Sequence, residues 1–94
     1  MNLYDTFEKF EDEYGEFERV QDKLSSRPDL HAFILLNQLC PGDRDMVSAA
    51  EHDEIYLDVD MDELAAVITE DQVCELARCG VRYDGGLDCL AMFV

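Results

Sequence analysis

Polar and apolar residues alternate strictly from Glu54 to Asp62. One parity carries apolar side chains and the other carries carboxylates with one tyrosine: Ile55, Leu57, Val59 and Met61 against Glu54, Tyr56, Asp58, Asp60 and Asp62. Successive side chains of an extended strand point to opposite faces. The pattern therefore predicts a strand near residues 54–60, with an aliphatic row in the core and an acidic row in water.

The first 24 residues carry an apolar stripe with helical spacing. Its members follow one another at intervals of three, four or seven residues: Leu3, Phe7, Phe10, Tyr14, Phe17 and Leu24. This spacing predicts an amphipathic helix near residues 3–24, in which Gly15 costs about 1 kcal/mol. We expect the stripe to pack against its own domain. An uncovered stripe would favour dimerisation, so both a monomer and a homodimer remain open.

Capping and turn residues divide the rest of the chain. Ser26 is the expected N-cap of a helix near 28–40, and Asp60 and Thr69 open capping boxes for helices near 61–68 and 70–79. A hairpin is expected from strands near 81–84 and 87–93, and residues 42–50 are expected to be a loop with a short helical turn or strand. The prediction is one α+β domain, residues 1–94, with an antiparallel sheet of about three strands covered on one face by helices.

The charge is large and unevenly distributed. The 94 residues include 23 acidic and 7 basic side chains, for a net charge of −16. Residues 51–72 hold nine acids and no base, and residues 1–24 hold eight acids and three bases. Such a chain is repelled by nucleic acid and by anionic lipid, so we expect neither direct nucleic-acid binding nor membrane binding. Its partners should be basic.

The sequence shows no features of export. The N-terminus lacks a basic region followed by an apolar core, and the longest apolar runs are five residues. We therefore expect a cytoplasmic protein, with Cys40, Cys74, Cys79 and Cys89 present as thiols.

No pattern of residues indicates a cofactor or a catalytic site. Asp58, Asp60 and Asp62 have the spacing that opens an EF-hand loop, but Glu63 and Thr69 stand where that loop needs glycine and glutamate. The spacing of Cys74 and Cys79 does not suit zinc. A nucleophile elbow and a phosphate-binding loop are both missing. We expect neither an enzyme nor a metal or cofactor.

An acidic surface that binds a basic protein is the remaining interpretation. Its candidate residues come from the two acidic segments: Glu8, Glu11, Asp12, Glu13 and Glu16 from the first, and Asp53, Glu54, Asp58, Asp60, Asp62 and Glu63 from the second. A strand carries only one such carboxylate per roughly 6.7 Å. Imitation of DNA therefore requires the first helix to lie beside the acidic strand as a second ridge.

Two segments carry a resemblance to a known class of protein. Ala-Ala-Glu-His-Asp-Glu-Ile-Tyr-Leu-Asp-Val-Asp (49–60) and Cys-Gly-Val-Arg-Tyr-Asp (79–84) with Cys-Leu-Ala-Met-Phe-Val (89–94) resemble small acidic accessory proteins of bacteriophages and other mobile elements. Anti-CRISPR inhibitors are similar in size and charge. The resemblance implies a stoichiometric, DNA-mimicking inhibitor in the bacterial cytoplasm, whose partner is a basic nucleic-acid-binding protein such as a Cas effector subunit.

A second function stays open beside the inhibitor. The chain would then be a small acidic interaction or structural module, dimeric through the aromatic stripe of residues 3–24, with its charge serving solubility.

Overall fold

A computed structural model describes residues 1–94 and contains four α-helices, two short 3-10 helices and four strands. In chain order these are α1 (Leu3–Lys9), η1 (Glu11–Glu13), η2 (Phe17–Arg19), α2 (Pro28–Leu39), β1 (Val47–Glu51), β2 (Glu54–Leu57), α3 (Met61–Val67), α4 (Glu70–Arg78), β3 (Val81–Asp84) and β4 (Cys89–Phe93). The predicted α+β class is confirmed, and the sheet has four strands where about three were expected.

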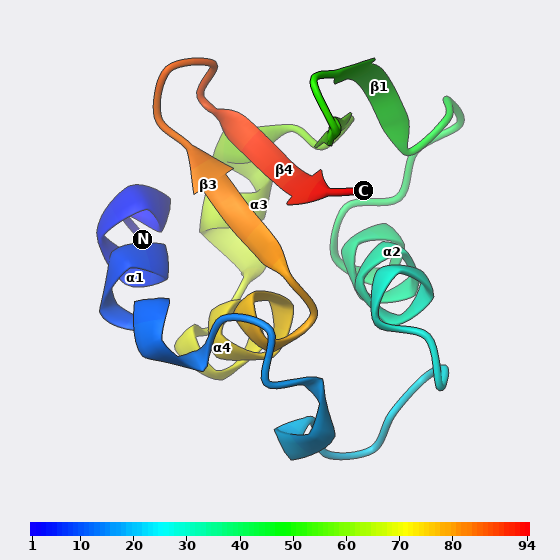
Figure 1. The fold of residues 1–94 in the computed structure, drawn as a ribbon. Coiled ribbons are helices and arrows are strands. Elements are labelled where there is room, and N and C mark those ends of the chain that lie inside the picture. The colour runs from blue at the N-terminus through cyan, green and yellow to red at the C-terminus, as the bar shows by residue number, and fades with distance from the viewer.

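The strands form one antiparallel sheet in the order β1-β2-β4-β3. Strands β1 and β2 form one hairpin and β3 and β4 the other, and β2 pairs with β4 to join them. The sheet edges are therefore β1 and β3. In Figure 1, α3 lies behind β3 and β4, α1 lies beside β3, and α2 lies on the far side of the molecule from α1.

One face of the sheet is covered by helices, as predicted. Cross-strand partners share a face, so Val81, Met92 and Ile55 point to the same side. The hydrophobic core joins this inner face to residues of all four helices: Leu3 and Phe7, Leu35 and Leu36, Leu64, and Val73 and Leu76. The opposite face carries Arg82, Tyr56 and Phe93, and we call it the outer face.

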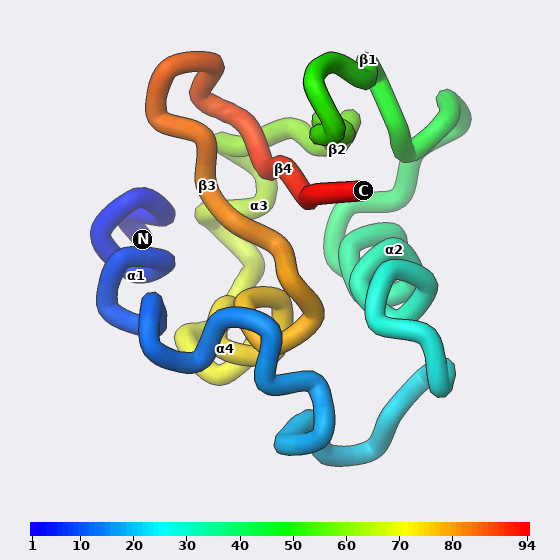
Figure 2. Tube along the Cα trace, in the orientation of Figure 1, coloured from blue at the N-terminus to red at the C-terminus, as the bar shows by residue number.

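The predicted helix near 3–24 is wrong beyond its first two turns. Helix α1 ends at Lys9, and the chain continues through η1 and η2. A straight helix of 22 residues would be about 33 Å long, but the longest dimension of the molecule is 28 Å. The segment instead bends around α4, as Figure 2 shows.

Two contacts hold this bent segment on α4. Gly15 has a φ of +78°, and its N–H donates to the carbonyl of Ala77. The Glu13 carboxylate accepts from Arg78 of α4 and from Arg19 of η2, at 3.1 and 3.0 Å. The glycine expected to weaken a helix is therefore the residue that allows the chain to turn.

The strand predicted near 54–60 ends earlier, at Leu57. Asp60 has left the sheet and caps α3 by accepting from the Glu63 N–H at 3.0 Å. The apolar residues of the alternating pattern still face inward beyond the end of the strand, because Val59 and Met61 pack against the core. Segment 42–50, expected to be mostly loop, contributes β1, in which all five residues are exposed.

The other predicted elements are confirmed, with small shifts at their ends. Thr69 and Gln72 form a complete capping box on α4. The predicted N-cap Ser26 is wrong by one residue: Arg27 precedes α2, because Pro28 occupies the first helical position. The last strand starts at Cys89, two residues later than expected, because residues 85–88 form the turn.

A buried histidine ties α2 to the rest of the fold. The His31 side chain is fully buried; its Nδ1 accepts from the Leu24 N–H at 3.0 Å and its Nε2 lies 2.5 Å from a Glu75 carboxylate oxygen. Because Nδ1 accepts, the ring proton lies on Nε2 and is donated to Glu75. His31 thus links the loop before α2 to α4.

The turn at Gly15 gives a test of the bent segment. We expect Gly15→Ala to lower the free energy of unfolding by about 1–2 kcal/mol, because alanine is disfavoured at positive φ. Gly42→Ala is the matched control, since nothing lies within 4 Å of either position and only Gly15 has a positive φ. Urea denaturation measures both. Stabilisation by Gly15→Ala would instead indicate the continuous helix.

The four cysteines are free thiols, and burial raises the pKa of Cys79 from 9.0 to about 12. Above pH 9 the unfolded chain ionises at this thiol while the folded chain keeps it protonated. The stabilisation is therefore complete below pH 9 and is lost as the pH rises toward 12. Denaturation between pH 8 and about 11 should show a shallower decline for Cys79→Ala than for the unmodified chain. Equal declines would contradict the burial of this thiol.

Candidate binding surface

Most acidic side chains have no basic partner. Five of the seven Lys and Arg residues contact carboxylates, and the five acids involved are Glu13, Glu54, Asp58, Glu70 and Asp84. Of the 23 acidic residues, 18 therefore have no Lys or Arg partner. Only Lys23 and Arg27 among the bases lack a carboxylate contact. The molecule thus retains a large excess of unneutralised negative charge.

Four of the predicted surface acids are engaged within the fold. Glu13 contacts Arg19 and Arg78, and Asp58 contacts Arg44 through both carboxylate oxygens at 3.0 and 3.1 Å. Glu54 forms an ion pair with Arg82, and Asp60 caps α3. The outward carboxylate row expected from Glu54 to Asp62 is therefore interrupted at three of its four acids.

The neighbouring bases alter the acidity of these groups. The hydrogen bond from Arg78 lowers the pKa of Glu13. Glu16 behaves in the opposite way, because a hydrogen bond with Glu18 and repulsion by that carboxylate raise its pKa. Glu13 is therefore a neutralised, structural carboxylate, whereas Glu16 and Glu18 form no ion pair and repel each other.

The remaining predicted acids fall into two separate groups. Glu8, Glu11, Asp12 and Glu16 form what we call the N-terminal acidic group, and Asp53, Asp62 and Glu63 the central acidic group. All are exposed except Glu16, which is half-buried. Strand β2 is separated from β3 and α1 by β4, and of the central acidic group only Asp53 adjoins β2, whereas Asp62 and Glu63 lie in the first turn of α3. The arrangement with the first helix beside the acidic strand is therefore not present.

The outer face of the sheet centres on Arg82. Its guanidinium contacts Glu54 and Asp84 and lies 4.6 Å from the centre of the Phe93 ring. Ala91 beneath it is fully buried. The outer face is thus a locally neutralised surface with an aromatic side chain and not a continuous acidic ridge.

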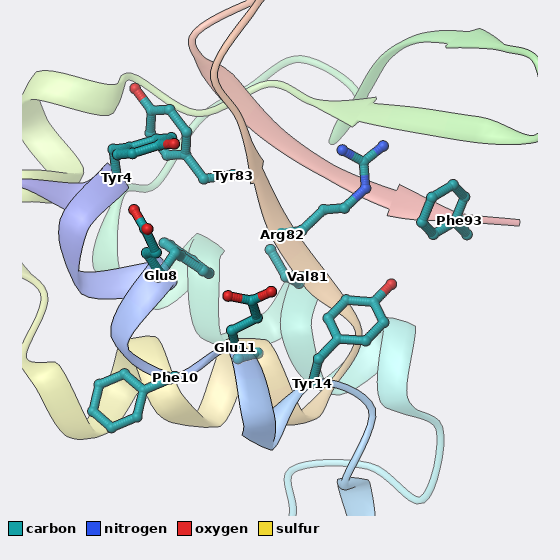
Figure 3. Close-up of a pocket in the computed structure, with 11 residues that line it drawn as sticks. Tyr4, Glu8, Phe10, Glu11, Tyr14, Val81, Arg82, Tyr83 and Phe93 are labelled. Atoms are coloured by element: carbon teal, nitrogen blue, oxygen red, sulfur yellow. The ribbon is translucent and has the colours of Figure 1, made fainter.

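A groove of about 400 Å³ runs between the N-terminal segment and β3. Eight of its eleven lining residues are hydrophobic; the lining comprises Tyr4, Phe7, Glu8, Phe10, Glu11, Tyr14, Ala77, Val81, Arg82, Tyr83 and Phe93. Figure 3 shows the carboxylates of Glu8 and Glu11 directed toward β3. We call this feature the aromatic groove.

Three aromatic residues of the groove are strongly exposed. Phe93 is 61% exposed, Tyr4 52% and Tyr14 41%. Exposed aromatic side chains that line one concavity are typical of protein-binding surfaces. Glu8 and Glu11 were predicted from the clustering of charge in the sequence, whereas Tyr4, Arg82 and Phe93 were not predicted. Phe93 could have been predicted from the alternation of side chains along β4, which places it on the face opposite the buried Met92.

The aromatic stripe of residues 3–24 is largely used within the domain. Leu3 and Phe7 are buried, and Phe10 and Phe17 pack against the core. Phe17 also meets the His31 ring edge-on at 6.0 Å between centroids. Tyr14 and Leu24 are the members left exposed, so the stripe presents no continuous face to a second copy.

A second cavity, of about 690 Å³, lies between the N-terminal segment and α4. Its charged residues are of both signs and include the Glu13–Arg78 pair.

Nowhere in the chain do three or more His, Cys, Asp or Glu side chains come together in a way that would hold a metal ion. None of the helices has the length and apolarity needed to cross a membrane.

The structural role of Asp60 can be measured. We expect Asp60→Ala to lower the free energy of unfolding by about 1 kcal/mol, because the N-cap bond to Glu63 is lost. Asp43→Ala, the same change at an exposed acid without a side-chain contact, should alter stability by less than about 0.5 kcal/mol. Thermal or urea denaturation measures both. Equal effects would contradict the capping role.

Comparisons with known proteins provide no relative. No family model, no curated protein and no solved structure matches the chain.

Proposed function

We propose that this protein acts by binding and not by catalysis: it is a stoichiometric inhibitor that occupies the Lys/Arg-lined groove of a nucleic-acid-binding protein. The partner class that the sequence resemblance implies is a subunit of a Cas effector complex in the bacterial cytoplasm. The observation that carries the proposal is the excess of 18 carboxylates without a Lys or Arg partner over two unpaired bases.

The density of charge supports competition with DNA. The molecule is 28 Å long and carries a net charge of −16. Duplex DNA of that length carries about 16 charges, one per about 1.7 Å of axis. A basic groove that grips DNA by releasing counterions can therefore bind this protein through the same electrostatic interaction.

The geometry favours the N-terminal acidic group as the principal contact. Two of its four members, Glu8 and Glu11, line the aromatic groove, so charge and apolar area come together there. In the central acidic group, Asp53 lies beside Val94, and Asp62 and Glu63 lie in α3. This group does not line the groove and would extend the contact at its rim, where charges act mainly on association rate. The engaged acids Glu13, Glu54, Asp58 and Asp60 support the scaffold instead of contacting the partner directly.

A small acidic interaction or structural module is the second candidate. The observation that favours it is the use of Asp60, Glu13 and Asp58 in capping and ion pairing, because such roles explain part of the acidity by folding alone. This candidate predicts no competition with nucleic acid.

Binding to the partner should depend steeply on salt and exclude DNA. Immobilised protein can capture basic proteins from a bacterial lysate, and each captured protein can be tested for a DNA mobility shift. We expect the protein to abolish the shift, and its affinity to fall at least about tenfold when salt is raised from about 0.1 M to about 0.5 M. Simultaneous binding of DNA and this protein, or an affinity independent of salt, would contradict the proposal.

A further inference from the structure

The aromatic groove has a chemistry more specific than general acidity. Its wall from β3 and β4 presents Arg82 and Phe93, and its wall from α1 and η1 presents Glu8 and Glu11. Figure 3 shows Tyr14 and Phe93 toward one end and Tyr4 and Tyr83 toward the other. Carboxylates and aromatic rings therefore face the same space.

The two groove carboxylates are available to a partner. Neither Glu8 nor Glu11 forms an ion pair, and both are exposed. The nearby bases are already engaged, because Lys9 pairs with Glu70 and Arg82 pairs with Glu54 and Asp84. Arg82 lines the groove as well, but it is paired with Glu54 and Asp84, so neither Glu8 nor Glu11 is neutralised by an ion pair.

The aromatic rings of this chain already accept cations. Arg82 lies 4.6 Å from the centre of the Phe93 ring, Lys23 lies 5.1 Å from that of Phe17, and Lys9 lies 5.9 Å from that of Phe10. Tyr4 and Tyr14 make no such contact and are exposed, although Tyr4 packs edge-to-face with Tyr83 at 5.7 Å between ring centroids. An incoming cation thus finds the unoccupied Tyr14 ring and the exposed part of the Tyr4 ring beside free carboxylates, an arrangement that favours cation–π contacts.

Arginine fits this combination better than lysine. A guanidinium is planar, so it stacks on an aromatic ring, and its donors match a carboxylate in a two-pronged hydrogen bond. The groove volume of about 400 Å³ falls in the range of small-ligand sites. It therefore suits side chains of a peptide segment and not a whole helix or duplex.

We infer that the aromatic groove binds an arginine-bearing segment of the basic partner, with the guanidinium stacked on Tyr14 or Tyr4 and hydrogen-bonded to Glu11 or Glu8. This inference rests on the proposed function and names the contact that makes it specific. Glu8 and Glu11 of the N-terminal acidic group then not only attract the basic partner but also fix the position of one of its arginine side chains.

The probe is an acetylated and amidated peptide, Gly-Arg-Ala-Arg-Gly, with lysine and citrulline versions as controls. It is titrated into the full ¹⁵N-labelled chain at about 0.05 M salt, where surface charges are weakly screened. We expect the arginine peptide to shift the amide resonances of groove residues, to bind about five times more tightly than the lysine peptide, and to lose binding when citrulline replaces arginine.

Two double variants distinguish binding in the groove from nonspecific attraction by the negative charge of the molecule. Glu8→Gln/Glu11→Gln and Asp12→Asn/Asp22→Asn each remove two negative charges from exposed acids of the N-terminal region, but neither Asp12 nor Asp22 lines the groove. We expect the first to weaken binding of the arginine peptide about tenfold and the second less than about twofold. Tyr14→Leu should reduce the preference for arginine over lysine.

The outcomes distinguish the two proposals. Equal weakening by both double variants, or shifts confined to residues outside the groove, would overturn the groove inference and leave the acidic inhibitor standing. Failure of a long polyarginine chain to bind at low salt would overturn the proposed function as well. Denaturation curves of each variant confirm that it is folded, which is expected because neither glutamate has a side-chain hydrogen bond.

Discussion

Burial of one face of a small sheet is the interaction on which the rest of the structure depends. The inner residues Val81, Leu90 and Leu57 are at most 2% exposed, and residues from all four helices cover them. A domain of this size has a limited apolar core with which to offset a charge of −16. The N-terminal segment therefore has to wrap around the core instead of extending past it, and that wrapping forms the aromatic groove.

Elements whose formation depends on neighbouring residues were predicted from the sequence, whereas elements that depend on distant contacts were not. Alternation in 54–57 and the capping box at Thr69 depend on neighbouring residues, and both are present in the structure. The predicted helix near 3–24 was wrong because short turns satisfy the same periodicity and still place Phe7, Phe10 and Phe17 against the hydrophobic core. Strand β1 was not clearly predicted, since its residues are all exposed and it depends on pairing with β2.

For the candidate site, too, features set by local sequence were predicted and features set by tertiary contacts were not. The sequence identified Glu8 and Glu11 as surface acids, but it could not show that Asp58 meets Arg44 or that Glu54 meets Arg82, because those partners are distant in the chain. Nor could it bring Phe93 beside residues 4–14. Clusters of charge are readable from a sequence, whereas their neutralisation depends on tertiary contacts.

Neutralisation also determines what the remaining charge can do. Where Arg78 and Arg19 surround Glu13, the carboxylate stabilises the bend and its pKa is lowered. Where Glu16 meets Glu18, neither carboxylate forms an ion pair, and the hydrogen bond with Glu18 and repulsion by that carboxylate raise the pKa of Glu16. Repulsion of this kind costs free energy in the isolated chain, and a basic partner removes it on binding. Relief of self-repulsion therefore adds to the affinity for a basic partner and favours exposed acids that lack an internal partner, among them Glu8 and Glu11 of the aromatic groove.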